Sequence, residues 1–347
     1  MRQCYISRNY KTLGEAGSKA KTDIEKIMQK KGFENIGLEQ SLSKNTIVHF
    51  VRNFIGIQKA KMSLKKDDVV LLQYPLKKYY ESVCDTAHQK GAKVITLIHD
   101  LGSFRRKKLT VEREIERLHH SDVIIAHNDN MCKWLKDNGC AKPVLPLGIF
   151  DYLSDSTIKR DFDKEYASDG RWSVCFVGKM VVSENAFLYE LMKKLEKTDM
   201  YLYGGGYSEA DAKPLKPEFV HKMGFVKDFE LMQKGDGHFG LSWYGDSLAE
   251  GSGKIGEYMS YNNPHKVSLY LRCQMPVIIS KTAGLASFVE KEGVGLTVDT
   301  LEDIEETLAK ITPEQYNEMK KNVERVARKI ANGEFASDAI DRALELI

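Results

Sequence analysis

Three uninterrupted apolar runs in the first half of the chain most strongly limit its fold. They read DVVLLQY at 68–74, KVITLIH at 93–99 and DVIIA at 122–126, with helical sequence between them. Runs that are apolar throughout, rather than at alternate positions, are typical of strands buried on both faces, as in parallel sheets. The first half is therefore predicted to be a doubly wound α/β domain. Its other expected elements are a strand at 1–7 and helices at 18–31, 46–64 and 131–138.

The second half repeats this alternation after a polar, aperiodic stretch at 151–171, which we interpret as a linker. We predict an α/β fold of two Rossmann-like domains, at 1–155 and 172–330. Residues 331–347 are expected to form a helix that packs back on the first domain. The expected strands are 173–177, 200–203, 220–225, 239–243, 276–279 and 295–298, and the expected helices are 184–195, 229–234, 284–291, 301–311 and one opening at Asn263. Thr312, with Pro313 and Gln315, is typical of the start of a last long helix.

Charge is shared unequally along the 347 residues. Residues 1–160 hold 29 Lys and Arg against 18 Asp and Glu, whereas the remainder holds 23 against 31, for a net charge of +3. The basic clusters at 65–66, 77–78 and 105–108 predict an anionic partner. Because no nucleic-acid motif accompanies them, a membrane surface or lipid phosphate is favoured over nucleic acid, with solvated surface charge as the alternative.

No apolar run approaches the roughly 20 residues that span a bilayer, and the N-terminal sequence turns polar too early for a signal peptide. The six cysteines form no C-x-x-C pair, so free thiols are expected. These features predict a cytoplasmic protein. Peripheral contact with the inner face of the membrane and homo-oligomer formation remain open.

Three features follow strands of the second half and predict an anion site. Gly178 and Lys179 follow the strand at 173–177, and the triplet 204–206, which begins with Gly204 and Gly205, follows the next strand. The third is Asn263-Pro264-His265-Lys266, in which Asn263 is a suitable N-cap and Pro264 a suitable first helical residue. A lysine in a first helical turn is disfavoured by the helix dipole, and a bound phosphate would offset this. Alternatively, these are an ordinary turn and a solvated lysine.

The glycine-rich segment 245–261 follows a strand, and a loop of this length is typical of a ligand loop that is mobile until substrate binds. A disordered insertion is the alternative.

In the first half, His99 and Asp100 end a buried strand and are candidate general bases, although either could have a structural role. Ser7, Arg8, Gly17 and Ser103 are candidate acceptor contacts. The run 14–18 lacks G-x-G-x-x-G spacing, which disfavours a nicotinamide cofactor. Asp161-Phe162-Asp163 has the D-x-D pattern that binds a metal in some transferases, but its place in the linker disfavours a metal role, and no metal is expected.

A family resemblance rests on the segments 16–27, 94–105, 122–139 and 239–279, which include AGSKAKTDIEKI, VITLIHDLGSFR, FGLSW, Tyr261, Lys266 and Pro276-Val277-Ile278. These resemble GT-B glycosyltransferases, and most specifically the bacterial galactofuranosyltransferases, which are related to streptococcal glucosyltransferases that extend adhesin glycans. The resemblance implies a UDP-sugar donor bound in the second domain, a glycan or lipid-linked acceptor bound in the first, and metal independence. It also assigns Phe225, Trp243 and Tyr261 to the donor site.

The resemblance implies UDP-galactofuranose as the donor and surface polysaccharide synthesis as the role. One departure is that Leu269-Tyr270-Leu271 stands where many retaining relatives carry a ribose-binding glutamate, which argues for inversion. The alternatives are a glucosyltransferase that uses UDP-glucose, and an inactive sugar-nucleotide-binding partner subunit. A solute-binding module or an epimerase fits less well, because export signals and cofactor glycines are missing from the sequence.

Overall fold

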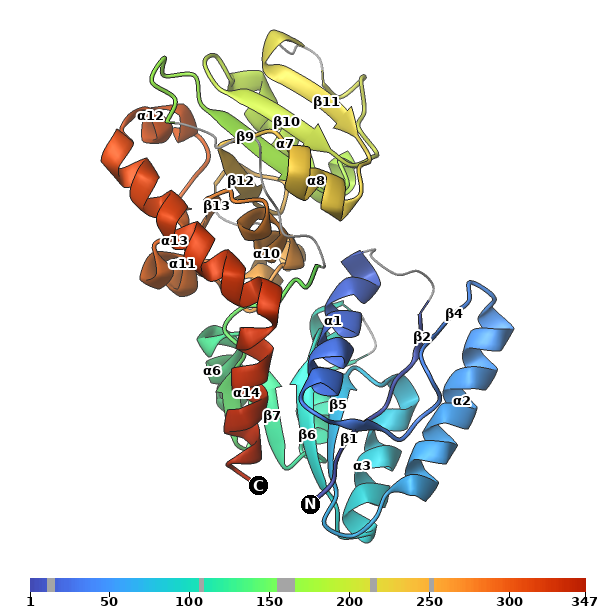
Figure 1. The fold of residues 1–347 in the computed structure, drawn as a ribbon. Coiled ribbons are helices and arrows are strands. Elements are labelled where there is room, and N and C mark those ends of the chain that lie inside the picture. Colours follow the sequence, from blue (N-terminus) through green and yellow to red (C-terminus); the bar gives the residue numbers. More distant parts are fainter. Residues whose placement is uncertain (11–15, 106–108, 155–165, 213–216, 250–252) are drawn as a thin grey trace. The chain divides into compact units, whose positions relative to one another are not determined.

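The computed structural model describes residues 1–10, 16–105, 109–154, 166–212, 217–249 and 253–347. The motif Asp161-Phe162-Asp163 therefore lies outside the described residues. Contacts between Cα atoms divide the chain into two units, Met1–Tyr152 with Gly333–Ile347, and Leu153–Asn332. Figure 1 shows that each unit contains its own sheet and its own covering helices.

The first unit is built on a six-stranded sheet in the order β3-β1-β5-β6-β7-β8, and all its paired strands are parallel. The apolar runs form its centre, and every residue of β5 and β7 is buried. The predicted parallel sheet is therefore confirmed. The strands are β1 (Gln3–Tyr5), β3 (Glu34–Asn35), β5 (Val69–Tyr74), β6 (Lys93–Ile98), β7 (Val123–Ala126) and β8 (Val144–Pro146).

Helices cover both faces of this sheet, because the strand order reverses direction at β1 and right-handed crossovers in opposite directions place their helices on opposite faces. Helices α1 and α14 pack together on one face (Figure 1). A separate two-stranded sheet pairs β2 (Asn9–Tyr10) with β4 (Ser41–Leu42), and α2 packs on β2 and α3. The helices are α1 (Ala16–Lys30), α2 (Thr46–Ser63), α3 (Tyr80–Gln89), α4 (Gly102–Arg105), α5 (Val111–Leu118), α6 (Asp129–Asp137) and α14 (Glu334–Leu344).

The C-terminal part of the chain is two helices rather than one long helix. Gly333 has a φ of 79° and separates α13 (Pro313–Asn332) from α14. This left-handed conformation is easily adopted by glycine but strained for other residues, so the first helix ends there. Asp151 then receives a 2.7 Å hydrogen bond from the Ala336 amide in the first turn of α14, and Lys31 Nζ lies 2.7 Å from Asp341. These contacts fix α14 on the first unit.

The second unit repeats the doubly wound pattern in a parallel sheet with the order β11-β10-β9-β12-β13-β14. Its strands are β9 (Ser173–Val177), β10 (Asp199–Tyr203), β11 (Val220–Gly224), β12 (Phe239–Ser242), β13 (Val277–Ser280) and β14 (Gly295–Val298). Its helices are α7 (Val182–Lys194), α8 (Asp228–Lys234), α9 (Gly253–Met259), α10 (His265–Arg272), α11 (Ala286–Glu292), α12 (Ile304–Ala309) and α13.

The core of the second unit contains an aromatic cluster at the amino ends of its central strands. The Trp172 ring lies 5.2 Å from the ring of Tyr316 and 5.4 Å from that of Phe239. Tyr316 is placed by the start of α13, where the Gln315 amide donates to Thr312 Oγ1 and the Thr312 amide donates to Gln315 Oε1. The predicted capping box is confirmed. It directs α13 across this core.

All six cysteines are free and buried, as expected. Within the described ranges, none of the helices combines the length and the hydrophobicity needed to cross a bilayer.

Candidate functional site

The carboxyl ends of four strands in the second unit gather the predicted anion-binding features. Because β9, β10, β12 and β13 are parallel, the residues that follow them lie along one edge of the sheet. Gly178 follows β9, Gly204 follows β10, and Trp243 and Tyr244 follow β12. Helix α10 connects this edge to β13.

The start of α10 differs by one residue from the prediction. The N-cap is Pro264, with φ −63° and ψ 122°, and its side chain makes no capping hydrogen bond. Asn263, expected to be the cap, instead precedes it and is buried. Proline has no side-chain acceptor, so the extended backbone alone begins the helix. His265 and Lys266 are therefore the first two helical residues and still belong to the first turn.

Lys266 is held by aromatic rings rather than by a carboxylate. Its Nζ lies 3.9 Å from the centre of the Tyr244 ring and 4.7 Å from that of Phe176. Among the described residues, no carboxylate or hydrogen-bond acceptor pairs with this nitrogen. Burial lowers the pKa of Lys266 to about 7, because the charged form loses water without gaining an anion. An incoming anion would supply the missing charge.

Tyr270, one turn after Lys266, connects α10 to the sheet. Its hydroxyl donates to the Leu241 carbonyl at 2.9 Å and accepts from the Val177 amide at 2.8 Å. The ring lies directly over Gly240, where a Cβ would stand 2.2 Å from the nearest ring atom. A glycine in β12 and a tyrosine in α10 thus set the distance between helix and sheet.

The glycines after β9 and β10 are required mainly by backbone packing. A Cβ on Gly204 would lie 2.0 Å from the Gly178 carbonyl oxygen. The Gly178 amide donates to the Tyr203 carbonyl and the Gly204 amide donates to the Gly224 carbonyl, so neither amide is available to a phosphate. This corrects the expectation that the whole triplet presents its amides.

Other backbone amides at this edge of the sheet are not engaged by the fold. The amides of Lys179 and Gly205 make no hydrogen bond to any part of the chain that the structure describes. A Cβ added to Gly205 would also meet nothing within 4 Å. The Gly206 amide likewise makes no hydrogen bond within the described residues, so these three amides are backbone donors that remain for an anion.

The Lys179 side chain is exposed, and its Nζ lies 3.9 Å from Glu184. Its carbonyl is held by Asn185, whose Nδ2 donates at 2.9 Å. Asn185 is buried within a kink of α7, and its Oδ1 has no partner in the described residues. Sequence reasoning missed Asn185, because only the fold shows the kink.

A pocket opens between the ends of β12 and β13 and the C-terminal part of α9. It is lined by Ser242, Trp243, Tyr244, Gly256, Met259, Ser260, Pro264, Ser280, Thr282 and Ala283. Trp243 is only 2% exposed, and its indole N–H donates to the Ser247 carbonyl. It therefore forms part of the pocket wall, and its indole N–H is already engaged by the backbone. The segment 245–261 contains α9 rather than being loop throughout.

The remaining donor-site candidates are spread around this edge. Phe225 follows β11 and is 80% exposed. Tyr261 and His265 are partly exposed and flank Asn263 on either side of the start of α10. Phe225 is the predicted contact with the most open ring surface.

In the first unit, the candidate bases follow β6. His99 Nε2 lies 2.6 Å from Gln73 Oε1, and the imidazole stacks on the Phe150 ring at 5.4 Å. Asp100 is partly exposed immediately after it. His99 is fixed on two sides, which favours a structural role for the histidine.

Ser7 and Arg8, predicted to contact an acceptor, are tied into the unit. The Ser7 hydroxyl donates to Glu25 Oε2 at 2.5 Å, and the Tyr10 hydroxyl donates to the other carboxylate oxygen. Burial raises the pKa of Glu25, and these two hydrogen bonds oppose that shift. The Ser7 hydroxyl therefore stabilises the buried carboxylate of Glu25. The sequence alone did not predict this role of Glu25.

Arg8 is the cation nearest this cluster, and its guanidinium donates to the backbone carbonyls of Gln73 and Pro75. Within the described ranges, no carboxylate forms an ion pair with it. Burial lowers the pKa of Arg8. The nearby carboxylate of Glu25 opposes this shift in the pKa of Arg8, although the two side chains form no described ion pair.

Ser103 and Gly17 both lie in first helical turns. Glu114 is fully buried and accepts hydrogen bonds from the amides of Gly102 and Ser103 at 2.7 and 2.8 Å. The Ser103 hydroxyl is buried without a described partner. Gly17 is the second residue of α1. Glu114 already occupies the amides at the start of α4, so a ligand there would meet the hydroxyl rather than the backbone.

Comparison with known proteins also divides the chain into two parts, although the second part includes most of α14. Residues 3–149 match the family described as Glucosyltransferase 3-like, N-terminal domain, and residues 174–343 match Glucosyltransferase 3-like, C-terminal domain. The chain is 26% identical to the β-1,6-galactofuranosyltransferase WbbI of Escherichia coli K12 over 332 residues, 95% of each protein. It is 22% identical to Glucosyltransferase 3 of Streptococcus gordonii over 337 residues, 94% of each.

Solved structures resemble the whole fold. The lipopolysaccharide outer core galactosyltransferase WaaB superposes with a TM-score of 0.64 at 13% identity, covering 99% of both chains. Anabaena HepE in complex with UDP gives 0.63 at 11% identity, covering all of both chains. At these identities the likeness establishes the fold, which is GT-B. Since the two domain families together match most of the sequence, the chain belongs to the glucosyltransferase 3-like family and is a GT-B glycosyltransferase.

Proposed function

We propose that the chain transfers galactofuranose from UDP-galactofuranose to a hydroxyl group of a glycan or lipid-linked acceptor, with inversion, during surface polysaccharide synthesis. The observation that carries the donor assignment is Lys266, a cation without a carboxylate in the first turn of α10. A uridine diphosphate provides the anion that this position lacks. The full-length similarity to a galactofuranosyltransferase supports the choice of sugar.

The proposed reaction breaks the bond between the anomeric carbon and the UDP oxygen while the acceptor oxygen bonds to that carbon. Negative charge then develops on the departing diphosphate, where Lys266, Lys179 and the Gly205 amide stabilise it. One preorganised donor at such a position can contribute about 3–4 kcal/mol. Asp100 accepts the acceptor proton, since a single base suffices for inversion. The Lys266 cation supplies the role that a divalent metal has in other transferases, so we propose transfer without a metal.

UDP-glucose is the second candidate donor, because the chain also aligns over its full length with a streptococcal Glucosyltransferase 3. A third possibility is a sugar-nucleotide-binding subunit that lacks activity. All three candidate functions use the same donor site. They differ in which sugar is bound or in whether the sugar is transferred.

A thermal-shift panel with UDP, UDP-galactofuranose, UDP-glucose and UDP-galactose tests the donor. Binding to the folded state raises stability by RT ln(1 + [L]/Kd), so the preferred donor gives the largest shift at equal concentration. UDP release with acceptor glycans and EDTA present then tests turnover and metal independence. The absence of a shift with every uridine nucleotide would remove the donor assignment, and a shift without turnover would favour the inactive subunit.

A further inference from the structure

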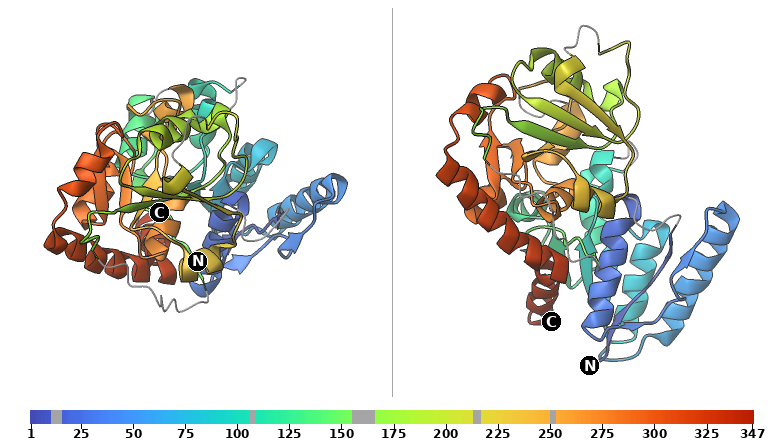
Figure 2. Two further views of the ribbon diagram at one scale, coloured as in Figure 1. Left: turned by 90° about the horizontal axis from the view of Figure 1, so that it is seen from above. Right: turned by 45° about the horizontal axis from the view of Figure 1, so that its top comes forward.

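Helix α2 of the first unit carries a face of large apolar side chains in solvent. Figure 2 shows this helix at the outer side of the first unit, next to the two-stranded sheet. Its outward positions recur at helical spacing, so their side chains form one continuous strip. The exposed apolar residues are Ile47, Val48, Phe50, Val51, Phe54, Ile55 and Met62. Exposed apolar patches of this kind on a soluble domain mark a site of interaction.

The opposite face of α2 holds the helix on the unit. Ile57 and Ala60 are buried, and Gly56 lets the helix approach Leu38, whose amide nitrogen lies 3.5 Å from the position of an added Cβ. The exposed apolar strip is therefore separate from the face by which α2 packs on the unit. Helix α2 has both an inner and an outer apolar side.

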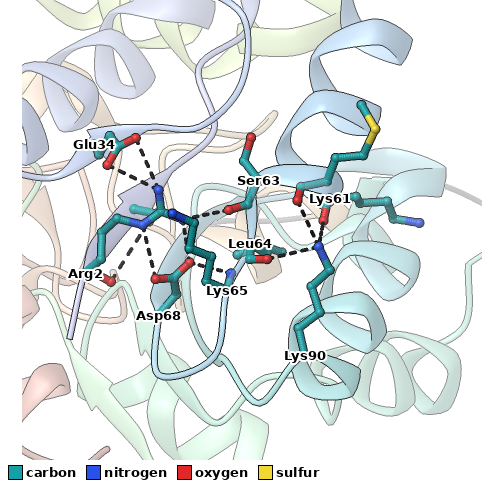
Figure 3. A network of polar contacts seen from close by, with 10 residues as sticks. Arg2, Glu34, Lys61, Ser63, Leu64, Lys65, Asp68 and Lys90 are labelled. Carbon is teal, nitrogen blue, oxygen red and sulfur yellow. Dashed lines mark hydrogen bonds and ion pairs between the residues drawn. The ribbon is translucent and has the colours of Figure 1, made fainter.

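The C-terminal end of α2 is fixed by cations, as Figure 3 shows. Lys90 Nζ donates to the carbonyl oxygens of Lys61, Met62 and Leu64 at 2.8–3.0 Å. Arg2 donates to the Ser63 carbonyl at 2.7 Å and pairs with Asp68. Positive charges at a helix C-terminus stabilise it, so the apolar strip is presented on a firmly anchored helix.

Charge identifies the partner. Helix α2 contains no aspartate or glutamate but does contain Arg52, Lys59 and Lys61. Lys78, from the neighbouring segment, lies with its Nζ 5.0 Å from the Phe50 ring. Two copies of this face would bring like charges together, which opposes self-association. Apolar side chains beside cations, with no acidic residue, match an anionic lipid surface.

We propose that α2 is a membrane-docking helix whose apolar strip enters the headgroup region of an anionic bilayer. Arg52, Lys61 and Lys78 contact the lipid phosphates there. The docking surface lies outside the donor site and is independent of which sugar is transferred. It would hold the first unit at the membrane, where a lipid-linked acceptor is found.

Sedimentation of the whole protein with lipid vesicles tests the proposal. We expect binding to vesicles that contain phosphatidylglycerol and little binding to pure phosphatidylcholine. The triple variant Ile47→Ser, Phe50→Ser, Phe54→Ser should bind the anionic vesicles about tenfold or more weakly, because its apolar contribution is lost. Arg52→Gln with Lys61→Gln should weaken binding severalfold and reduce its dependence on salt.

Matched controls separate this role from a general loss of structure. Phe229→Ser and Leu346→Ser remove exposed apolar side chains elsewhere and should leave vesicle binding unchanged. The triple variant should keep its melting temperature and its thermal shift with UDP, so a failure of docking is distinguishable from a failure of the donor assignment. Equal binding to neutral and anionic vesicles would overturn the proposal. So would an absence of vesicle binding combined with a dimer that the triple variant dissociates, which would make this face an interface between copies.

Discussion

The amino group of Lys266 lies 3.9 Å from the centre of the Tyr244 ring, although the two residues come from different elements at the carboxyl edge of the second sheet. An aromatic face attracts a cation but does not neutralise it. Lys266 is therefore less stable in its charged form than a lysine in water, and this is expressed in its lowered pKa. A residue that destabilises the free protein and awaits an anion is suited to binding a diphosphate.

Lys266→Met should separate binding from stability. Methionine keeps the length of the side chain and removes the charge, so affinity for UDP should fall by about tenfold to a hundredfold, measured by calorimetry. At pH 7 the free variant should be more stable to urea by about 1–3 kcal/mol, since a partly buried charge is lost. Lys281→Met, which removes an exposed lysine paired with Asp299, is the control and should change neither property markedly. Unchanged UDP affinity in Lys266→Met would rule out the assigned role.

The affinity for the proposed donor, UDP-galactofuranose, should fall as pH rises above 7. In the free protein the pKa of Lys266 is about 7, and a bound diphosphate raises it, so binding above pH 7 takes up a proton. The dissociation constant should increase by roughly tenfold between pH 7 and pH 8.5. Calorimetry in buffers with different ionisation enthalpies measures the proton uptake directly. Lys266→Met should abolish both effects, and a pH-independent affinity in the unmodified protein would contradict this prediction.

The contribution of Lys266 to the stability of the free protein should become less unfavourable as pH rises above 7. The pKa of Lys266 is lowered in the folded state, so the unfolded chain binds more protons between about pH 7 and pH 10.5. The contribution of this residue therefore destabilises the fold fully below pH 7 and diminishes as pH rises towards 10.5. The difference in unfolding free energy between Lys266→Met and the unmodified protein should shrink over the same range.

Tyr270→Phe should destabilise the second unit. The change leaves the Val177 amide and the Leu241 carbonyl without their partner, and each buried unsatisfied group costs about 1–3 kcal/mol. We expect a loss of about 2–4 kcal/mol in urea unfolding. Tyr201→Phe is a matched control, because the Tyr201 hydroxyl makes no hydrogen bond within the described ranges, and its effect should stay within about 0.5 kcal/mol.

Gly204 and Gly205 should respond differently to alanine. Gly204→Ala places a Cβ 2.0 Å from the Gly178 carbonyl at a φ of 138°, so the second unit should lose more than about 3 kcal/mol or fail to fold. Gly205→Ala meets no atom within 4 Å and should fold normally. If the Gly205 amide binds phosphate, this methyl group should weaken UDP affinity severalfold. Normal affinity in Gly205→Ala would leave Lys266 as the main anion contact.

Asp100→Asn should reduce kcat by about 10²–10⁴-fold and leave the dissociation constant for the donor within twofold, because a general base acts on the acceptor only. His99→Asn should have a smaller effect on kcat, since His99 is already engaged by Gln73 and Phe150. Full activity in Asp100→Asn would place the base elsewhere. Single-turnover measurement of UDP release distinguishes these cases.

The central strands were predictable because their sequences are apolar throughout. Residues 173–177 match β9 completely, and α2 ends one residue before its predicted end. The two-residue strands β3 and β4 were missed, since segments so short carry no periodicity. The C-terminal helix expected at 331–347 corresponds to α14, which begins at Glu334, but one glycine in the sequence does not reveal the φ that separates it from α13.

Site residues that follow a strand could be predicted from the sequence. Residues whose role depends on hydrogen bonds to distant parts of the chain could not. Lys266 could be placed beside β9 and β12 from the order of elements alone. The roles of Tyr270, Glu25 and Asn185 depend on hydrogen bonds to residues elsewhere in the chain, and no local pattern encodes them. For Trp243, the sequence could not show how far the side chain is buried, because an aromatic residue after a strand looks the same whether it packs inward or faces a ligand.

The return of α14 to the first unit has a consequence for biosynthesis. The ribosome synthesises residues 1–152 before the second unit, yet the helix that packs against α1, β7 and β8 is synthesised after it. Until then, the side chains that α14 covers have no permanent cover, and the carboxylate of Asp151 lacks the amides that it caps. The first unit can thus be completed only after the second has been synthesised, so a truncation that removes α14 and spares the whole second unit should still damage the first.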